Sequence, residues 1–338
     1  MQHMNKIASR YHTAVITAEG KVAYWKKEPI LVDAINSNGD NIVNYSTSCD
    51  FHEDSNNIVS IKLGERHSVA LTADGCVICA GDNLLGQCNV PPNLKNVVQI
   101  DCSNCFSAAL TAEGQIICWG NGTQLLHIPS RVFKQVCCGH HHIAALTICG
   151  KVVCFGKNDH EQCDVPLDLE NVVTITCNHN CNVALTATGR AINWGNNMFY
   201  PRFYKQITTP NFENISMVSC GLLHCVALTF KDQVVCWGDN SAGQCNVPPD
   251  LNSVFVHCFT THSAAITADG RVVCWGDNDY GQCDVPLDLE NVINVCCGIK
   301  HTTAITVEGR VVCWGDNTHG QCNVPEDLVA DTGMVVLM

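Results

Sequence analysis

The chain has 338 residues, a formal charge of −13 and 46% hydrophobic residues, which is enough apolar material for a core. Its basic residues are scattered, which argues against generic binding to nucleic-acid backbones. Neither a signal peptide nor an apolar run of membrane-spanning length is evident, so we expect no membrane association and a cytoplasmic location, with a virion as the alternative.

An internal repeat begins at the N-terminus and continues to the end of the chain. Copies of the pattern HxxA[L/I]TxxGxVxCWG define eight units, which span about residues 1–57, 58–98, 99–134, 135–173, 174–216, 217–255, 256–293 and 294–338. The six tryptophans fall at one repeat position, where Ala80 and Phe155 replace them in the other two units. Repeats of this length indicate a single domain, residues 1–338, built from stacked units.

Each unit contains three short β-rich runs, such as VINVCC, TTAIT and RVVCWG in the last copy. The second and third runs are joined by a short hairpin whose glycine supplies a positive φ. Because the runs are apolar at odd and even positions alike, both faces of each strand should be covered. The pattern predicts an all-β fold, a β-propeller of three-stranded blades.

The segments VVCWGDNDYGQCDVP and CGIKHTTAIT resemble repeats of the regulator-of-chromosome-condensation family, and in particular its short-repeat branch, which includes the bacterial β-lactamase inhibitor protein type II. Members of that family usually close with seven blades, so the resemblance implies seven where the direct count gives eight. It does not imply one function, because the family includes exchange factors for a small GTPase, enzyme inhibitors, photoreceptors and ubiquitin-ligase adaptors.

The order of the runs predicts which loops share a face. If the first strand is innermost, the CGxxH turn and the long link GDNxxGQCxVPxDL emerge on one side and the hairpins on the other. The ordinary link is a structural turn of Asp, Asn and Gly. Residues 26–57, 120–134 and 196–210 depart from it, and their common face is the candidate binding surface.

Residues 196–210, NNMFYPRFYKQITTP, are the most divergent link. They contain residue types enriched at interface hot spots, so we predict partner binding by Phe199, Tyr200, Arg202, Phe203 and Tyr204. The alternative is that these rings pack against neighbouring blades. Both interpretations stay open at the level of sequence.

The 25 cysteines occupy mainly three repeat positions. They are Cys79, Cys118, Cys154, Cys236, Cys274 and Cys313 on the third strand, Cys88, Cys163, Cys245, Cys283 and Cys322 in the link, and Cys102, Cys138, Cys177, Cys220, Cys258 and Cys297 near the end of the first strand. We expect most to be reduced and buried as small apolar residues. Strands one and three are too far apart for a bridge, so only bridges between blades or through loops are expected.

A metal site is an alternative use of some cysteines. CSNC, CCGHHH and CNHNC lie in three consecutive units and would supply Cys102, Cys105, Cys137, Cys138, His140, Cys177, His179 and Cys181. Thiolate and imidazole are the ligands that zinc prefers, but the spacings differ between units. A histidine at one repeat position in six of the eight units, with Phe106 and Cys181 in the other two, indicates packing and hydrogen bonding, since catalysis needs only one copy.

The C-terminal part of the chain is acidic. From Asp232 onward there are fourteen acidic residues and three basic ones, Arg271, Lys300 and Arg310. These carboxylates would attract a basic partner, although solvated loop residues that favour solubility have the same composition.

The sequence therefore favours a non-catalytic protein-interaction module without a cofactor, which holds a protein partner on irregular loops of one face. The alternative is a metal-binding or redox protein that uses its cysteines and histidines. Guanine-nucleotide exchange ranks third, because no residue of an exchange factor can be transferred to this chain.

Overall fold

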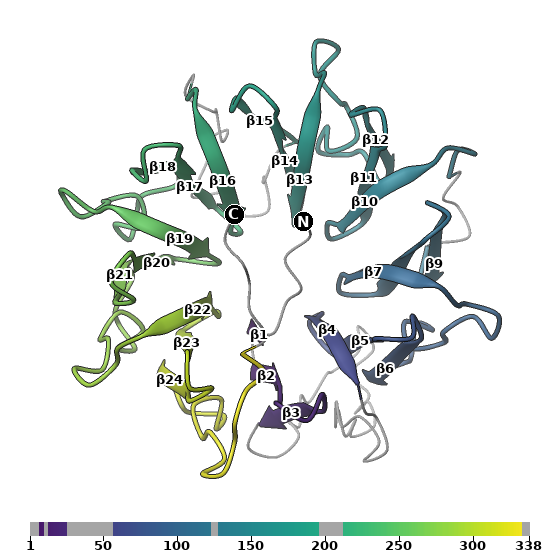
Figure 1. The fold of residues 1–338 in the computed structure, drawn as a ribbon. Helices are drawn as coiled ribbons and strands as arrows, with labels where there is room; N and C mark the ends of the chain where they lie inside the picture. Colours follow the sequence, from purple (N-terminus) through teal and green to yellow (C-terminus); the bar gives the residue numbers. More distant parts are fainter. Residues whose placement is uncertain (1–6, 10–12, 26–56, 123–127, 196–211, 333–338) are drawn as a thin grey trace, which may run out of the picture.

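The computed structural model describes residues 7–9, 13–25, 57–122, 128–195 and 212–332 (Figure 1). Within these ranges the strands form eight three-stranded antiparallel sheets, and no helix occurs. The sheets follow one another as blades around a central axis (Figure 1). The predicted propeller is confirmed, and the blade number is eight rather than seven. None of the described residues belongs to a helix that could cross a membrane.

Strand order within every sheet follows the chain, so the second strand is central. The first strands are β1 (Ile7–Ser9), β4 (Ile58–Leu63), β7 (Val97–Cys102), β10 (Phe133–Cys138), β13 (Val172–Asn178), β16 (Ile215–Cys220), β19 (Ser253–Cys258) and β22 (Val292–Cys297). The second strands are β2 (Thr13–Ile16), β5 (His67–Thr72), β8 (Phe106–Thr111), β11 (His142–Thr147), β14 (Cys181–Thr186), β17 (His224–Thr229), β20 (His262–Thr267) and β23 (His301–Thr306). The third strands are β3 (Val22–Trp25), β6 (Val77–Gly81), β9 (Ile116–Gly120), β12 (Val152–Gly156), β15 (Ala191–Gly195), β18 (Val234–Gly238), β21 (Val272–Gly276) and β24 (Val311–Gly315).

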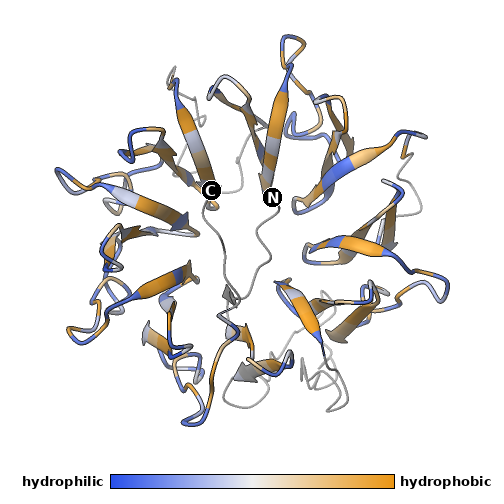
Figure 2. Ribbon diagram, in the orientation of Figure 1, coloured by the Kyte–Doolittle hydropathy of each residue, from blue (hydrophilic) through white to orange (hydrophobic). Residues whose placement is uncertain are grey.

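The core lies between adjacent blades rather than at one centre. Central strands such as β5, β8 and β11 are buried along their whole length, because a neighbouring blade covers each face. One cluster joins Val226 and Leu228 of the sixth blade to Val256, Ala265 and Trp275 of the seventh. Apolar strands and polar rim loops alternate around the ring (Figure 2).

The hairpins on the outer side of each blade also join neighbours. Gly75 has a φ of 81°, and its carbonyl accepts the N–H of Val97, the first residue of β7, at 3.0 Å. Asp232 takes the glycine position in the sixth unit with a φ of 59°, and its carbonyl accepts from Ser253 at 2.9 Å. The hairpin therefore keeps its left-handed backbone conformation in the unit where aspartate replaces glycine.

A buried hydrogen-bond chain joins each blade to the next. His262 begins β20, and its Nε2 lies 3.0 Å from Oγ1 of Thr302 in the following blade. That hydroxyl donates to the carbonyl of Gln282 at 2.8 Å, and Trp314 Nε1 donates to the same carbonyl at 3.0 Å. Since the hydroxyl proton is directed to Gln282, the histidine must donate through Nε2.

The same chain recurs at other blade interfaces. Histidine bonds the next blade in the pairs His67–Ser107, His142–Asn182, His224–Ser263, His262–Thr302 and His301–Thr13. All five histidines are buried. Their predicted packing and hydrogen-bonding role is confirmed.

The last of these pairs joins the final blade to the first. His301 Nε2 lies 2.9 Å from Thr13 Oγ1, and Trp25 Nε1 donates to the carbonyl of Gln321 at 2.9 Å. Asp331 N also donates to the carbonyl of Ile16 at 2.7 Å.

At two blade interfaces, apolar side chains occupy the positions of the histidine and of its hydrogen-bond partner. Phe106 stands at the histidine position of the third unit and packs with Ile143, which takes the hydroxyl position of the fourth. Cys181 and Cys225 make the equivalent buried pair between the fifth and sixth blades. The links between these blades lack the Gly-Gln-Cys sequence. Without the glutamine carbonyl, a buried hydroxyl at this position would lose its acceptor, at a cost of about 1–3 kcal/mol.

The cysteines of the described residues differ in part from expectation. Cys220 and Cys225 form a disulfide, and 22 other cysteines are free. The bridge joins the first and second strands of one blade, whose Cα atoms are 4.1 Å apart, so the exclusion of bridges within a blade was wrong for adjacent strands. The expectation that most cysteines are buried was also wrong, because only 7 of the free ones are. Strand three is covered on fewer sides than strand two.

Acidification should destabilise the ring. Burial lowers the pKa of His142, His224 and His301 to about 4 and that of His262 to about 3. Since the unfolded value is about 6.5, the unfolded chain binds protons below that pH that the folded chain excludes. The free energy of unfolding should be highest above pH 6.5. Acidification to about pH 5.5 should lower it by about 1 kcal/mol per histidine. Urea unfolding at the two pH values measures this loss.

An apolar pair provides the control, because Phe106 and Ile143 already occupy this place at one interface. The double variant H262F/T302I should fold, and its free energy of unfolding should fall by about 1 kcal/mol less on acidification. A free energy of unfolding that stays constant from neutral pH to about pH 5.5 would contradict the exclusion of protons from these histidines.

Candidate functional site

One face of the ring carries the turns between first and second strands and the starts of the links, and we call it the turn face. Asp82 N donates to the carbonyl of Arg66 at 2.8 Å, and Asp239 N donates to that of Leu223 at 2.9 Å. Each pair ties the first residue of a link to the turn of its own blade. The prediction that turns and links share a face is confirmed for the link starts.

The ordinary links are held by their own side chains. In the link after β6, Asn83 Nδ2 donates to Asn89 Oδ1 at 2.7 Å, and Cys88 N donates to Asn83 Oδ1 at 2.8 Å. Gln87 Oε1 accepts from Leu85 N at 2.9 Å, and the main-chain carbonyl of Gln87 accepts from the Ser107 hydroxyl of the next blade. The links after β12, β18, β21 and β24 repeat these bonds. Their structural role is confirmed.

The irregular links fall largely outside the described residues. This applies to residues 26–56, to 123–127 and to 196–211, which include Phe199, Tyr200, Arg202, Phe203 and Tyr204. The partner-binding role of these five residues therefore stays a prediction.

The blades that flank the irregular links are described. Ala80 and Phe155 replace tryptophan in blades that follow two of these links. After the third link, Trp237 is retained and packs against Phe212, with ring centroids 5.8 Å apart.

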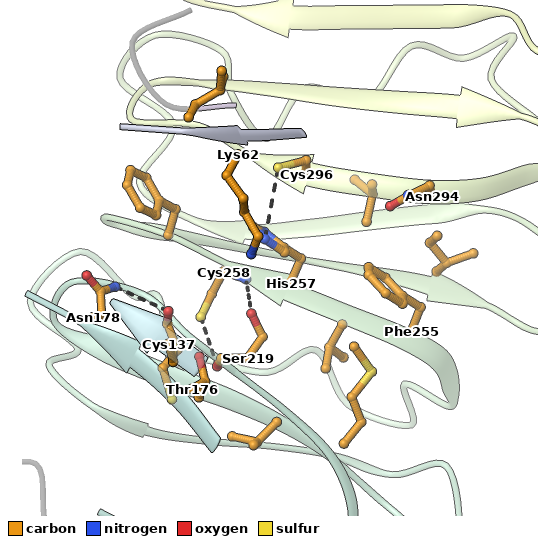
Figure 3. A pocket seen from close by; sticks show the side chains of 18 of the residues that line it. Lys62, Cys137, Thr176, Asn178, Ser219, Phe255, His257, Cys258, Asn294 and Cys296 are labelled. Carbon is orange, nitrogen blue, oxygen red and sulfur yellow. Dashed lines mark hydrogen bonds between the residues drawn. The ribbon is translucent and has the colours of Figure 1, made fainter. Parts of the chain in front are cut away.

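A cavity of about 590 Å³ runs along the axis of the ring. First strands from seven blades line it, and the turn residues Ser103, His140 and His179 border it on the turn face. Because strand-one residues form its wall, the prediction that the first strand is innermost is confirmed. Figure 3 shows Lys62, Cys137, Ser219 and His257 among the side chains on this wall.

Hydrogen bonds along the cavity wall join neighbouring blades at one position, the fifth residue of the first strand. At four interfaces the side chain of this residue accepts a hydrogen bond from the main-chain N–H of the sixth first-strand residue in the next blade. The pairs are Asp101 with Cys138 at 2.8 Å, Cys137 with Cys177 at 2.7 Å, Ser219 with Cys258 at 3.3 Å and His257 with Cys297 at 3.1 Å. These polar side chains therefore link blades as well as lining the cavity.

The sixth-position cysteines return a bond to the preceding blade. The thiols of Cys177, Cys258 and Cys297 donate to main-chain carbonyls at 3.4, 3.2 and 3.5 Å. Burial raises the pKa of Cys258 to about 12 and that of Cys177 and Cys297 well above the ordinary value. These thiols remain protonated at neutral pH, so they are donors rather than nucleophiles.

One cation, Lys62 of β4, lies on this wall. Lys62 Nζ lies 3.7 Å from Asp101 Oδ1, and this carboxylate raises the pKa of Lys62. Burial, and secondarily the charge of Lys62, lowers the pKa of His257 to about 4. At neutral pH the site therefore places a charged Lys62, 3.7 Å from Asp101, beside a neutral His257.

The cysteines and histidines predicted as a metal set lie in three adjacent blades, and most of them border the cavity. His140 stacks on His179 with ring centroids 4.4 Å apart, and Cys105 Sγ lies 3.9 Å from His141 Nδ1. Cys102, Cys138 and Cys181 are buried. Among the described residues no three Cys, His, Asp or Glu side chains gather closely enough to hold a metal ion.

Lys62, Asp101, Ser219 and His257 were not singled out by the sequence. They occupy one repeat position, directly before the CGxxH segment or its equivalent, where the units carry residues of different types. Comparison of the units for identical residues therefore misses this set, whereas comparison for a position that is polar or cysteine in units two to eight would identify it.

Six segments of the chain match the family model described as the Regulator of chromosome condensation (RCC1) repeat, and together they cover about half of the chain. They are residues 58–87, 97–124, 133–162, 215–244, 261–282 and 292–321. A search of curated proteins gives no match.

Several solved structures share the fold. The chain is similar to Prp20p from Saccharomyces cerevisiae, with 18% identity, a TM-score of 0.56 and coverage of 81% of this chain and 88% of that one. The same yeast protein bound to Kap60 gives 16% identity, a TM-score of 0.55 and coverage of 88% and 92%. The ectodomain of receptor kinase CR4 from Physcomitrella patens gives 18% identity, a TM-score of 0.54 and coverage of 76% and 74%. At these identities the likeness concerns the fold.

Loss of the Asp101 carboxylate should destabilise the ring. Asp101→Ala leaves the N–H of Cys138 without its acceptor and Lys62 without its counter-ion, so a loss of about 1–3 kcal/mol is expected in urea unfolding. Asp101→Asn keeps an acceptor oxygen and should lose less. Thr176→Ala, at the equivalent position of β13, is the matched control. Equal stability of the Asp101→Ala and Thr176→Ala variants would show that the contacts of Asp101 contribute nothing.

Proposed function

Because the chain belongs to the regulator of chromosome condensation repeat family, we propose that it is a non-catalytic module whose turn face binds a protein partner. Solved relatives of the fold support a protein-binding role. The work on Prp20p concerns binding to Gsp1p and histones, and yeast RCC1 is bound to Kap60 in a second structure. Within the family, we place the chain in the short-repeat branch that resembles β-lactamase inhibitor protein type II.

The observation that carries the proposal is the compensation at two of the three irregular links. An ordinary link supplies the glutamine carbonyl that accepts hydrogen bonds from a hydroxyl and a tryptophan of the next blade, as Gln244 does for Ser263 and Trp275. Links 120–132 and 196–211 lack the Gly-Gln-Cys sequence, and at their interfaces the apolar pairs Phe106–Ile143 and Cys181–Cys225 need no such acceptor. This structural requirement on the ordinary links therefore does not apply to these two.

The link 196–211 has the composition of a binding segment. It contains aromatic residues and an arginine, which are enriched at the centres of protein interfaces. A segment that only needed to replace a turn would require Asp, Asn and Gly, as in the other links. We therefore assign Phe199, Tyr200, Arg202, Phe203 and Tyr204 to the partner-binding surface.

The charge of the last three blades favours a basic partner. Asp239, Asp277 and Asp316 begin their links on the turn face. Nearby, Lys300 donates from Nζ to the Tyr280 hydroxyl at 2.7 Å and lies over the same ring. The acidic side chains on this part of the face outnumber the cations that could neutralise them, and a basic surface would be attracted to it.

Truncation of the aromatic side chains should abolish binding without unfolding the ring. We expect Phe203→Ala and Tyr204→Ala each to weaken binding by about 2 kcal/mol or more if they are central anchors. The partner is first captured with the intact chain, using a chain whose residues 196–210 are replaced by an ordinary link as the negative sample. Calorimetry with the purified partner and a melting curve then measure each variant.

Leu84→Ala is the matched control, since Leu84 is 59% exposed on an ordinary link, and it should leave both affinity and melting temperature unchanged. Aromatic variants that melt early but bind normally when folded would refute the interface. Acceleration of nucleotide release from a small GTPase partner would replace the proposed module with an exchange factor.

A further inference from the structure

Two of the repeated cysteine positions meet within one unit. Cys236 on β18 and Cys245 in the following link are 9 residues apart, and their Sγ atoms are 2.9 Å apart. The same spacing recurs at Cys79–Cys88, Cys154–Cys163, Cys274–Cys283 and Cys313–Cys322. These pairs join strand three to the link and not to strand one.

The link cysteines are placed alike in every unit that has one. The thiols of Cys88 and Cys163 donate to the carbonyl of the link's first residue at 3.4 Å, and those of Cys245, Cys283 and Cys322 do so at 3.3 Å. This bond turns the link sulfur back toward strand three. The placement of the link sulfur is therefore common to these five links, and at Cys236–Cys245 the strand-three thiol also lies 2.9 Å from it.

Within two pairs the thiols are chemically unequal. The hydrogen bond from Cys236 lowers the pKa of Cys245, and the bond from Cys79 lowers that of Cys88. In the other units burial raises the pKa of Cys163 to about 11 and of Cys283 and Cys322 to about 12. Because the thiolate is the nucleophile in disulfide exchange, the first two pairs should react before the others. Both link cysteines are partly exposed.

We propose that Cys236–Cys245 and Cys79–Cys88 are oxidative modification sites, each of which takes a small-molecule disulfide as its reagent and becomes an intrachain disulfide. The sulfur atoms of Cys236 and Cys245 need to approach by less than one ångström from the observed 2.9 Å to reach a bond length of about 2.05 Å; Cys79 and Cys88 hold the same two repeat positions, and Cys88 makes the same link hydrogen bond as Cys245. This assignment does not depend on the proposed partner.

The exchange balances in two steps. The Cys245 thiolate attacks one sulfur of RSSR, whose S–S bond breaks, and RS⁻ leaves and is protonated. The Cys236 thiol then releases its proton to solvent and attacks Cys245 Sγ in the mixed disulfide, which expels the second RS⁻. Two protein thiols are oxidised and RSSR is reduced to two RSH.

The bridge would tie the start of the link to its own blade without breaking the blade interface. Cys236 Sγ also lies 3.4 Å from the Gln244 carbonyl, but that carbonyl accepts hydrogen bonds from Ser263 and Trp275. Loss of one thiol donor therefore leaves the carbonyl satisfied. Oxidation would fix the position of the link while the ring stays folded.

The folded protein is incubated with oxidised glutathione, quenched with acid and N-ethylmaleimide, and cleaved before aspartate. Asp82 and Asp239 lie between the cysteines of the two pairs, so their peptides stay together only if a bridge has formed. Cys118 is the matched control, because it holds the strand-three position in a unit whose link has no cysteine. We expect bridged peptides at both pairs, and about ten-fold faster loss of alkylation at Cys245 than at Cys118.

In the Cys236→Ser variant, Cys245 should stop at a stable glutathione adduct, since no second thiol can resolve it. Circular dichroism during the reaction confirms that the ring remains folded. A stable adduct at Cys245 in the unmodified chain would overturn the proposal, and so would alkylation of Cys245 at the same level as Cys118.

Discussion

The ring depends on a buried bond from a histidine Nε2 to a hydroxyl or amide oxygen of the next blade. That oxygen belongs to a group that itself donates to a link carbonyl, as in His142–Asn182–Gln162. Each group is satisfied only if the blade, the link and the next blade are all in place. Because unsatisfied buried polar groups are costly, this arrangement fixes the order and the spacing of blades. The bond from His301 to Thr13 applies the same requirement to the closure of the ring.

The exceptions follow from the same requirement. Phe106 faces Ile143 and Cys181 faces Cys225, so donor and acceptor positions become apolar together. A change at only one of them would leave a polar group buried without its partner. The ordinary Gly-Gln-Cys link is absent from the sequence at the same two interfaces.

Cysteine serves several purposes in one repeat. First-strand thiols such as Cys258 are protonated donors within the channel wall, whereas Cys236 and Cys245 face each other at the rim. Depth in the blade accounts for the difference, because burial suppresses the thiolate and partial exposure permits exchange. A high cysteine content therefore does not by itself indicate a metal site or an oxidising environment.

The sequence by itself determined the blade: its three strands, its hairpin glycine, its structural link and the count of eight, since each depends on local pattern and repetition. It also identified the histidine position as structural. Only the tertiary structure decided which residues meet across blades, because the partner of His262 is about one unit further along and Thr302, Ser107 and Asn182 differ in type. For the same reason Lys62, Asp101 and His257 became a site only when the ring placed their strands around one channel. The link 196–210 has no such repeat to compare with, so a binding role for its residues could be proposed from composition alone.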